Sequence, residues 1–278
     1  MPTPDELTKT AATAIDTAAA QVPATQANDE FSDLIADAGK GTELIGANDV
    51  KPPRLLLCQS GSPQRKPDNL KQIKGLEELD LFNALSNQIY GRSLRFVVIA
   101  SLGSHWIEFD EELKVVELNV PEGDPRTLWR TKEDGSRLKP IAVHFYDYLL
   151  WLPDHMEVVV FSFKSTQISN AFKLNGMLRL PIKIGDKIIA NPPSWARVFK
   201  LTTKMQSDKG FEWGGFNLDQ DGITPRDVRA SISDLAKTYK DLKIEIDRTD
   251  DAADVAAEAA AAGDGTGQPT GQGDPEDM

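Results

Sequence analysis

Aromatic and basic side chains alternate through the middle of this 278-residue chain. The combination suits single-stranded nucleic acid, because bases stack on aromatic faces while phosphates attract Lys and Arg. The candidates for stacking on bases are Tyr146, Tyr148, Trp129, Phe163, Trp195 and Trp213. The candidates for phosphate contact are the basic residues Arg92, Arg95, Lys164, Lys173, Arg197, Lys200 and Lys204.

The segment 141–151, IAVHFYDYLLW, has the alternation of a strand. Successive side chains of a strand point to opposite faces, so one face here is apolar except for Asp147. The other face carries His144, Tyr146 and Tyr148. If that face is half-exposed, it forms a stacking platform. The same pattern is equally typical of tyrosines that pack beneath a helix with their hydroxyls at the rim.

Other chemistries leave weaker marks in the sequence. His105, His144 and His155 are too widely spaced for a metal-ligand pair, and the single cysteine, Cys58, lies in an apolar run. The chain has neither a phosphate-binding glycine loop nor a nucleophile elbow. We therefore expect no catalytic residue, no cofactor and no bound metal. A Mg²⁺-dependent nuclease remains an alternative, because one acidic cluster could hold the ion: Glu108, Asp110 and Glu111.

The two ends of the chain carry its net charge of −12. Residues 1–50 hold nine Asp or Glu and two Lys, and residues 250–278 hold eight Asp or Glu and no base, which leaves 51–249 with +3. The ends cannot bury enough apolar surface to offset the entropy of ordering. We expect a largely disordered acidic arm over 1–50 with a short helix near 29–38, a β-rich nucleic-acid-binding core over 51–249, and a disordered acidic tail over 250–278.

Hairpin patterns dominate the core. Residues 88–100 are expected to form a strand with 104–109 as its neighbour, 141–152 to pair with 156–164, and 195–206 to pair with 211–218. Helices are expected over 166–178 and 225–242, the second with Thr224 as its N-cap. This order favours a mainly β (α+β) fold, an antiparallel OB-like barrel with an inserted helix and a closing C-terminal helix. A sandwich or a split-sheet α+β fold fits the same pattern.

The layout of the chain resembles that of the single-stranded DNA-binding proteins of bacteria and their phages. The resemblance lies in a polar N-terminal arm, a mildly basic β core with interleaved aromatics, and an acidic tail that ends in GDPEDM. The segment KPPRLLLCQSGSP also resembles the openings of phage-encoded proteins. The resemblance implies that the tail binds replication or recombination proteins through its tip, Asp274, Glu276, Asp277 and Met278.

We therefore expect a sequence-nonspecific single-stranded DNA-binding protein of phage replication or recombination. A flexible polyanionic tail can occupy a cationic groove until DNA displaces it, or it can recruit partners; composition is equally typical of a solubilising tail. The alternative is a virion structural or assembly protein. A single cysteine, no signal peptide and no apolar span predict a cytoplasmic protein, in the host if phage-encoded, without a membrane partner. The sequence is compatible with a homo-oligomer.

Overall fold

The computed structural model describes residues 52–110, 114–135, 137–208, 211–240, 246 and 248. All of them belong to the compact unit Lys51–Met278. The expected arm over 1–50, with its helix near 29–38, and the expected tail over 250–278, with the tip residues 274–278, lie outside the described residues. None of the helices described is both long enough and apolar enough to span a membrane.

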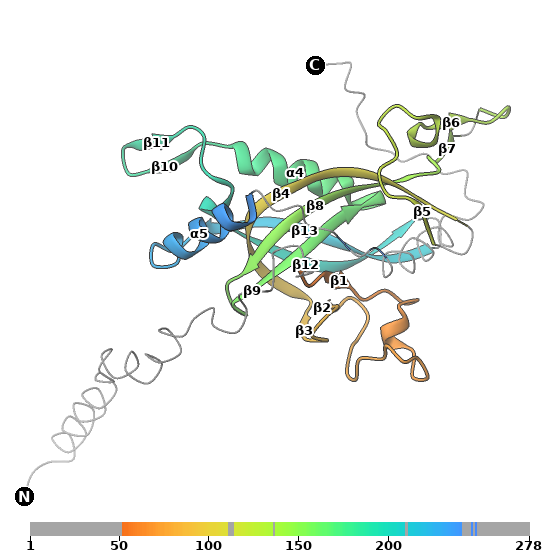
Figure 1. The fold of residues 1–278 in the computed structure, drawn as a ribbon, viewed down its shortest axis with the longest axis horizontal. Coiled ribbons are helices and arrows are strands. Elements are labelled where there is room, and N and C mark those ends of the chain that lie inside the picture. Colours follow the sequence, from red (N-terminus) through yellow and green to blue (C-terminus); the bar gives the residue numbers. More distant parts are fainter. Residues whose placement is uncertain are drawn as a thin grey trace, which may run out of the picture. The chain divides into compact units, whose positions relative to one another are not determined.

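A six-stranded antiparallel sheet forms the centre of the unit (Figure 1), with the order β13–β12–β4–β8–β9 and with β5 paired to β4. Its strands are β4 (Ser93–Phe109), β5 (Val115–Glu117), β8 (Val143–Leu152), β9 (Glu157–Lys164), β12 (Arg197–Asp208) and β13 (Phe211–Ile223). The hairpins β8–β9 and β12–β13 confirm the two pairings expected from the sequence. Polar turn residues flanked by alternating apolar residues make both pairings local.

Smaller elements surround this sheet. A three-stranded sheet contains β1 (Leu55–Leu57), β2 (Leu81–Asn83) and β3 (Ile89–Gly91). Two small hairpins are β6 (Arg130–Thr131) with β7 (Arg137–Leu138), and β10 (Ile182–Ile184) with β11 (Lys187–Ile189). The α-helices are α4 (Ile168–Arg179) and α5 (Arg229–Lys240). The expectation of a mainly β, antiparallel fold with an inserted and a closing helix is therefore confirmed.

Strand β4 differs from the expectation of two strands joined by a turn. It runs without interruption for 17 residues. The register with β8 shifts between Val98 and Ala100 and again between Ser101 and Gly103, where the glycine has a φ of +94°. Bulges of this kind bend a strand without ending it, so the glycine expected in a turn lies in a bend of one long strand.

Helix α5 begins later than expected. Its first residue is Arg229 rather than Pro225, and Thr224 is not its N-cap. The Thr224 hydroxyl donates instead to Trp195 O at 2.6 Å, and Thr224 O accepts from the Arg229 guanidinium at 2.8 Å. Thr224 thus holds the end of β13 against the 3₁₀ turn η5 (Ser194–Ala196), and the helix starts after that contact.

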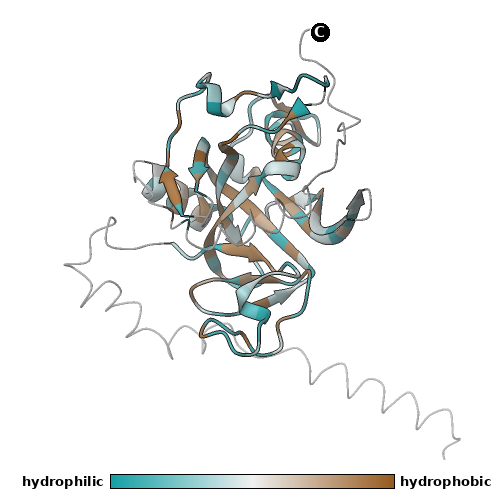
Figure 2. Ribbon diagram, turned by 90° about the vertical axis from the view of Figure 1, so that its right-hand side faces the viewer, coloured by the Kyte–Doolittle hydropathy of each residue, from teal (hydrophilic) through white to brown (hydrophobic). Residues whose placement is uncertain are grey.

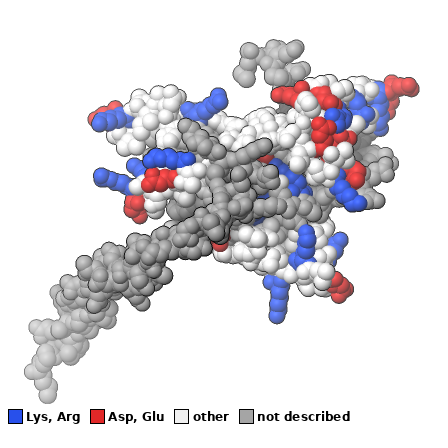
Figure 3. All heavy atoms as spheres, in the orientation of Figure 1, with Lys and Arg blue, Asp and Glu red and all other residues white. Residues whose placement is uncertain are grey.

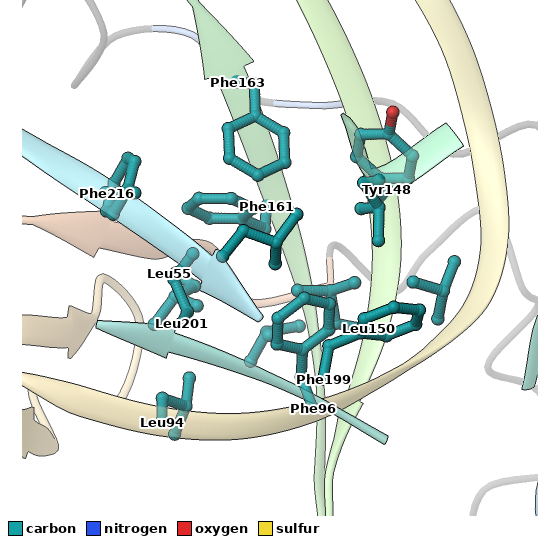
Figure 4. Packing of buried hydrophobic residues seen from close by; sticks show 14 of the residues in the cluster. Leu55, Leu94, Phe96, Tyr148, Leu150, Phe161, Phe163, Phe199, Leu201 and Phe216 are labelled. Atoms are coloured by element: carbon teal, nitrogen blue, oxygen red, sulfur yellow. The ribbon is translucent and has the colours of Figure 1, made fainter. Parts of the chain in front are cut away.

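The main core lies on the inner face of the curled sheet, where residues of α4 and β1 join those of the strands. Figure 4 shows part of this cluster. Phe161 packs edge to face against Phe163 and Phe216, with ring centroids 4.8 and 5.3 Å apart. Rings of β4 and β12 meet below them, where Phe96 stacks on Phe199 at 5.5 Å. Because strands from both edges of the sheet contribute to this cluster, burial of these rings curls the sheet around a single apolar interior.

A second core lies on the outer face, under α5. It joins Leu149 and Trp151 of β8 to the buried Ile232 of the helix. Apolar side chains therefore line both faces of the central strands, and these strands are coloured largely as hydrophobic in Figure 2. Central strands that are covered on both sides give near-continuous apolar runs in the sequence, such as YLLWL.

The expected OB-like barrel is not confirmed, because the sheet as described does not close. Side chains bridge the gap between the edge strands β9 and β13, which we call the seam. Gln59 accepts from Gly214 N at 2.8 Å and donates to Gly214 O at 3.2 Å. Gln167 accepts from Phe216 N at 3.2 Å, and the main chain of β9 donates to Pro53 O at 2.8 Å. Two glutamine amides thus satisfy edge groups that another strand would otherwise pair.

Candidate nucleic-acid interface

Four aromatic rings follow one another across β4, β8 and α4, and we call them the ring row: Trp106, His144, Tyr146 and Phe172. Trp106 stacks on His144 with centroids 4.2 Å apart and planes 5° from parallel. His144 lies 4.8 Å from Tyr146, which meets Phe172 edge to face at 5.5 Å. The row is a continuous aromatic surface built from three elements.

The antiparallel register places the first three rings on one face. Trp106 pairs directly with His144, and Ser104 pairs with Tyr146, so their side chains share the inner side of the sheet. Phe172 comes from α4, which crosses this face. Trp106, His144 and Tyr146 are half-buried, and Phe172 is 51% exposed. The row therefore leads from α4 toward the C-terminal end of β4 and the N-terminal end of β8, which pair with each other.

Burial sets the charge state of the row. It lowers the pKa of the His144 imidazole below its usual value, against a smaller opposing effect of Glu122. A neutral imidazole keeps the stack of rings uncharged at neutral pH. The bases that could hold phosphates therefore have to come from outside the row.

The chain from Lys164 to Lys200 supplies such bases, since it holds seven Lys or Arg and one acid, Asp186. It includes α4, the β10–β11 hairpin and the start of β12. Lys173, Arg179, Lys183, Lys187 and Lys200 in it are exposed. Figure 3 shows basic side chains projecting from the hairpin and its surroundings at the upper left, with mixed charges at the far end. Phe172 thus belongs to a stretch of the core with a net charge of +6.

Two of the six expected stacking residues are corrected. Tyr148 and Phe163 are fully buried, with ring centroids 5.9 Å apart and α4 above them. The Tyr148 hydroxyl donates to Asn175 Oδ1 at 2.9 Å, and burial raises its pKa. Rings that are 0% exposed offer no face to a base, so these two belong to the core. Of the two readings of the tyrosine face, packing beneath a helix holds for Tyr148.

The other expected stacking residues lie in different places. Tyr146 belongs to the ring row. Trp129 is 48% exposed and precedes β6, remote in sequence from α4. Trp195 is half-buried against the outer core under α5, and Trp213 is half-buried on β13. The structure therefore brings Tyr146 together with two rings that were not proposed for stacking, Trp106 and Phe172.

Among the expected phosphate contacts, Arg197 is corrected. Its side chain is buried at the C-terminal end of α4, where the guanidinium donates to Leu178 O, Leu180 O and Pro181 O. Burial lowers its pKa. The last carbonyls of a helix have no partner within the helix, and Arg197 donates to one of those of α4, Leu178 O, and to the two carbonyls that follow the helix. Its role is to hold the helix end and the chain that leads into β10.

The remaining expected phosphate contacts have the following places. Arg92 lies 3.5 Å from Glu77, and Arg95 donates to Asp154 at 2.9 Å, both on exposed surface. Lys200 pairs with Arg95 across β4 and β12, so these two bases share the outer face of the sheet, and Lys204 is exposed farther along β12. Lys164 lies over the Phe145 ring at 5.9 Å. Lys173 follows Phe172 on α4 and donates to Leu218 O.

The acidic cluster after β4 is engaged by one arginine. Arg126 donates to Glu108 at 2.6 Å, to Glu117 at 2.7 Å and to Asp124 at 2.9 Å, and hydrogen bonds from Arg126 lower the pKa of Asp124 to about 2. Asp110 accepts from the main chain at Lys114, while residues 111–113 lie outside the described part. No group of three or more His, Cys, Asp or Glu in the described ranges is placed to hold a metal ion.

Asp147, the charged exception on the apolar face of β8, pairs with Arg248. The carboxylate is 0% exposed and the arginine side chain 4% exposed, and they meet at 2.5 Å. Ser162 donates to the same carboxylate at 2.6 Å, and Arg248 lies 4.6 Å from the centre of the Phe145 ring. Arg248, two residues before the acidic segment 250–278 begins in the sequence, is therefore held on the outer face of the sheet.

Comparisons with known proteins place the chain in a family but near no characterised relative. No curated protein and no solved structure matches it. Residues 22–245 match the family model described as Pam3 phage gp34-like protein. Because this match covers most of the chain, the protein belongs to the Pam3 phage gp34-like family.

Proposed function

We propose that this protein binds single-stranded DNA without sequence preference, in phage DNA replication or recombination. The observation that carries the proposal is the ring row together with the bases that follow Phe172 on α4 and the β10–β11 hairpin. Stacking on aromatic rings contributes about 1–3 kcal/mol per base and is open to every base, because every base has a π-face.

Phe172, Tyr146 and Trp106 are the contact points for bases that we assign within the row. The Phe172 side chain is 51% exposed, so a base can stack on the part of the ring that the protein leaves uncovered. Tyr146 meets it edge to face, which supports the ring in position. Lys173 and Arg179, on the same helix, are exposed and are suited to the phosphates that flank a stacked base.

The acidic residues 250–278 fit a regulatory role. They begin in the sequence two residues after Arg248, which is paired with the buried Asp147. With eight acids and no base, this segment can compete with DNA for the basic stretch 164–200, or recruit replication or recombination proteins when DNA displaces it. Removal of residues 250–278 is then expected to tighten DNA binding, while Arg248 stays in place.

The family match supports a phage setting for this function. Binding can be tested by fluorescence anisotropy with labelled oligo-dT at several salt concentrations. We expect salt-dependent binding that weakens about tenfold in Phe172→Ala, the loss of roughly one stacked base. Leu85→Ala is the matched control, because Leu85 is 72% exposed outside the proposed interface and should leave binding unchanged. No binding at low salt contradicts the proposal.

One observation favours the alternative of a virion assembly protein. Large apolar residues are exposed in β5 and in the segment that connects it to β8, namely Val116, Leu118, Leu128, Trp129 and Ile141. Exposed apolar patches are typical of surfaces that contact another protein. An assembly protein would elute as a homo-oligomer from a sizing column, and oligo-dT would not change its elution. A shift of the elution with oligo-dT would favour the DNA-binding function.

A further inference from the structure

The β10–β11 hairpin exposes apolar side chains that the core does not use. Ile184 is 46%, Ile188 70% and Ile189 40% exposed, although isoleucine is among the residues most often buried. Its two strands have three residues each and pair with each other alone within the described residues. A two-stranded hairpin is marginal by itself, so its persistence depends on its attachment.

The attachment is rigid. Ile182, the first residue of β10, is 6% exposed, and Arg197 holds the main chain immediately before it at Leu180 and Pro181. At the tip, Gly185 has a φ of +58° in a two-residue turn with Asp186, a position that favours glycine. The hairpin is therefore a short arm with a fixed base and a tight tip, and we call it the arm.

Each exposed isoleucine near the tip faces a lysine. The register pairs Lys183 with Ile188 and Ile184 with Lys187, so both faces of the arm present one apolar and one cationic side chain. From Lys173 to Lys187 the chain holds four bases and one acid, and all four bases are exposed. This charge excludes a cationic partner and is complementary to a polyanion.

The arm and the ring row are linked by one helix. Phe172 lies in α4, and the arm begins just after that helix ends at Arg179. Seven residues of helix correspond to about 10 Å, the length of about three nucleotides. A nucleic acid that passes over Phe172 can therefore reach the arm within a few nucleotides.

We infer that the arm contacts the duplex at a junction between single-stranded and double-stranded DNA, an inference that rests on the proposed function. Its lysines bind the phosphates of the duplex end, and its exposed isoleucines pack against the terminal base pair. The outer face of that pair is not stacked on another pair, so this contact does not require bases to be unstacked. In several proteins that bind the minor groove, isoleucine and other apolar side chains insert as wedges between base steps. The strand that leaves the junction then runs along α4 to the ring row.

The test compares three labelled probes by anisotropy: oligo-dT, a blunt duplex, and the same duplex with a dT tail. We expect the full-length protein to bind the tailed duplex more tightly than either other probe. Ile188→Ser should reduce affinity for the tailed duplex about tenfold, the effect of losing one apolar contact, and should change affinity for oligo-dT less than about twofold. Leu85→Ser is the matched control, and thermal unfolding checks that each variant is folded.

The outcomes separate this inference from the function on which it rests. No binding of oligo-dT refutes the proposed function and, with it, the inference. Binding of oligo-dT without any gain on the tailed duplex refutes the inference alone. Equal losses on both probes in Ile188→Ser make the arm part of the single-strand site and also overturn it. If Ile188→Ser converts an oligomer to a smaller species on a sizing column, the arm joins copies of this chain and the inference is wrong.

Discussion

Replacing Arg248 by methionine tests the buried ion pair most severely. The change keeps an unbranched, largely apolar side chain but removes the guanidinium from Asp147, which is 0% exposed. Ser162, at 2.6 Å, and His105, with Nε2 at 3.4 Å, then remain as partners of the carboxylate. Loss of one member of a buried ion pair costs about 3–5 kcal/mol, because the other charge stays buried. The cation–π contact with Phe145 is lost as well.

A loss of this size is a large part of the stability of an ordinary domain, which is about 5–15 kcal/mol. Urea unfolding followed by tryptophan fluorescence measures it as a fall in midpoint at unchanged slope. Arg95→Met is the matched control. Its ion pair with Asp154 has exposed side chains on both sides, so it should change stability by less than about 1 kcal/mol.

The double variant Asp147→Leu/Arg248→Met completes the test. It removes both charges, so we expect it to recover much of the stability lost in Arg248→Met. The reasoning is refuted if Arg248→Met costs no more than Arg95→Met. It is also refuted if the double variant is as unstable as the two single changes added together. The same measurement decides where the chain can be shortened, since a chain that ends before Arg248 would lose this pair.

Three further predictions follow from other contacts. Arg197→Met leaves carbonyls at the end of α4 without their donor and should cost about 2–3 kcal/mol in urea unfolding, with faster amide exchange in the arm. Gly214→Ala places a Cβ 2.9 Å from Gln59 Oε1 and should destabilise the seam by about 1–3 kcal/mol, seen as a lower Tm. His144, whose pKa is lowered by burial, contributes stability that is complete above its unfolded pKa of about 6.5 and is lost as the pH falls through its folded pKa. His144→Phe should remove that part of the pH dependence, and an unchanged stability–pH curve contradicts the assignment.

The hairpins and the inserted helix could be predicted from the sequence because their signals are local. Turn residues between alternating apolar stretches fix β8–β9 and β12–β13, and a change of period marks α4. The contacts across the seam could not be predicted in this way. They depend on Gln59 and Gln167, whose partners Gly214 and Phe216 are distant in the sequence. The sequence around a glutamine does not indicate which strand's main-chain groups its amide will hydrogen-bond.

In the candidate site, too, local sequence patterns identify some residues, whereas others depend on contacts between distant segments. Tyr146 could be proposed because strand alternation places it opposite the apolar face of β8. Trp106 could not, since its contact with His144 requires the register of two strands and two bulges in β4. Phe172 could not be identified either, because its exposure depends on how α4 packs: Ala171 and Leu174 are buried against the sheet and Phe172 is left exposed. Tyr148 and Phe163 have the same residue types as a stacking platform and are buried only because α4 covers them.

Intrinsic tryptophan fluorescence during titration with oligo-dT tests the central claim most directly. If bases stack on the ring row, the wild-type protein should show quenching that saturates with oligo-dT and weakens with salt. Trp106→Phe keeps an aromatic ring, so binding measured by anisotropy should persist while a substantial part of the quenching is lost. Quenching that is unchanged in Trp106→Phe, or wild-type fluorescence that does not respond to oligo-dT at low salt, would contradict the account.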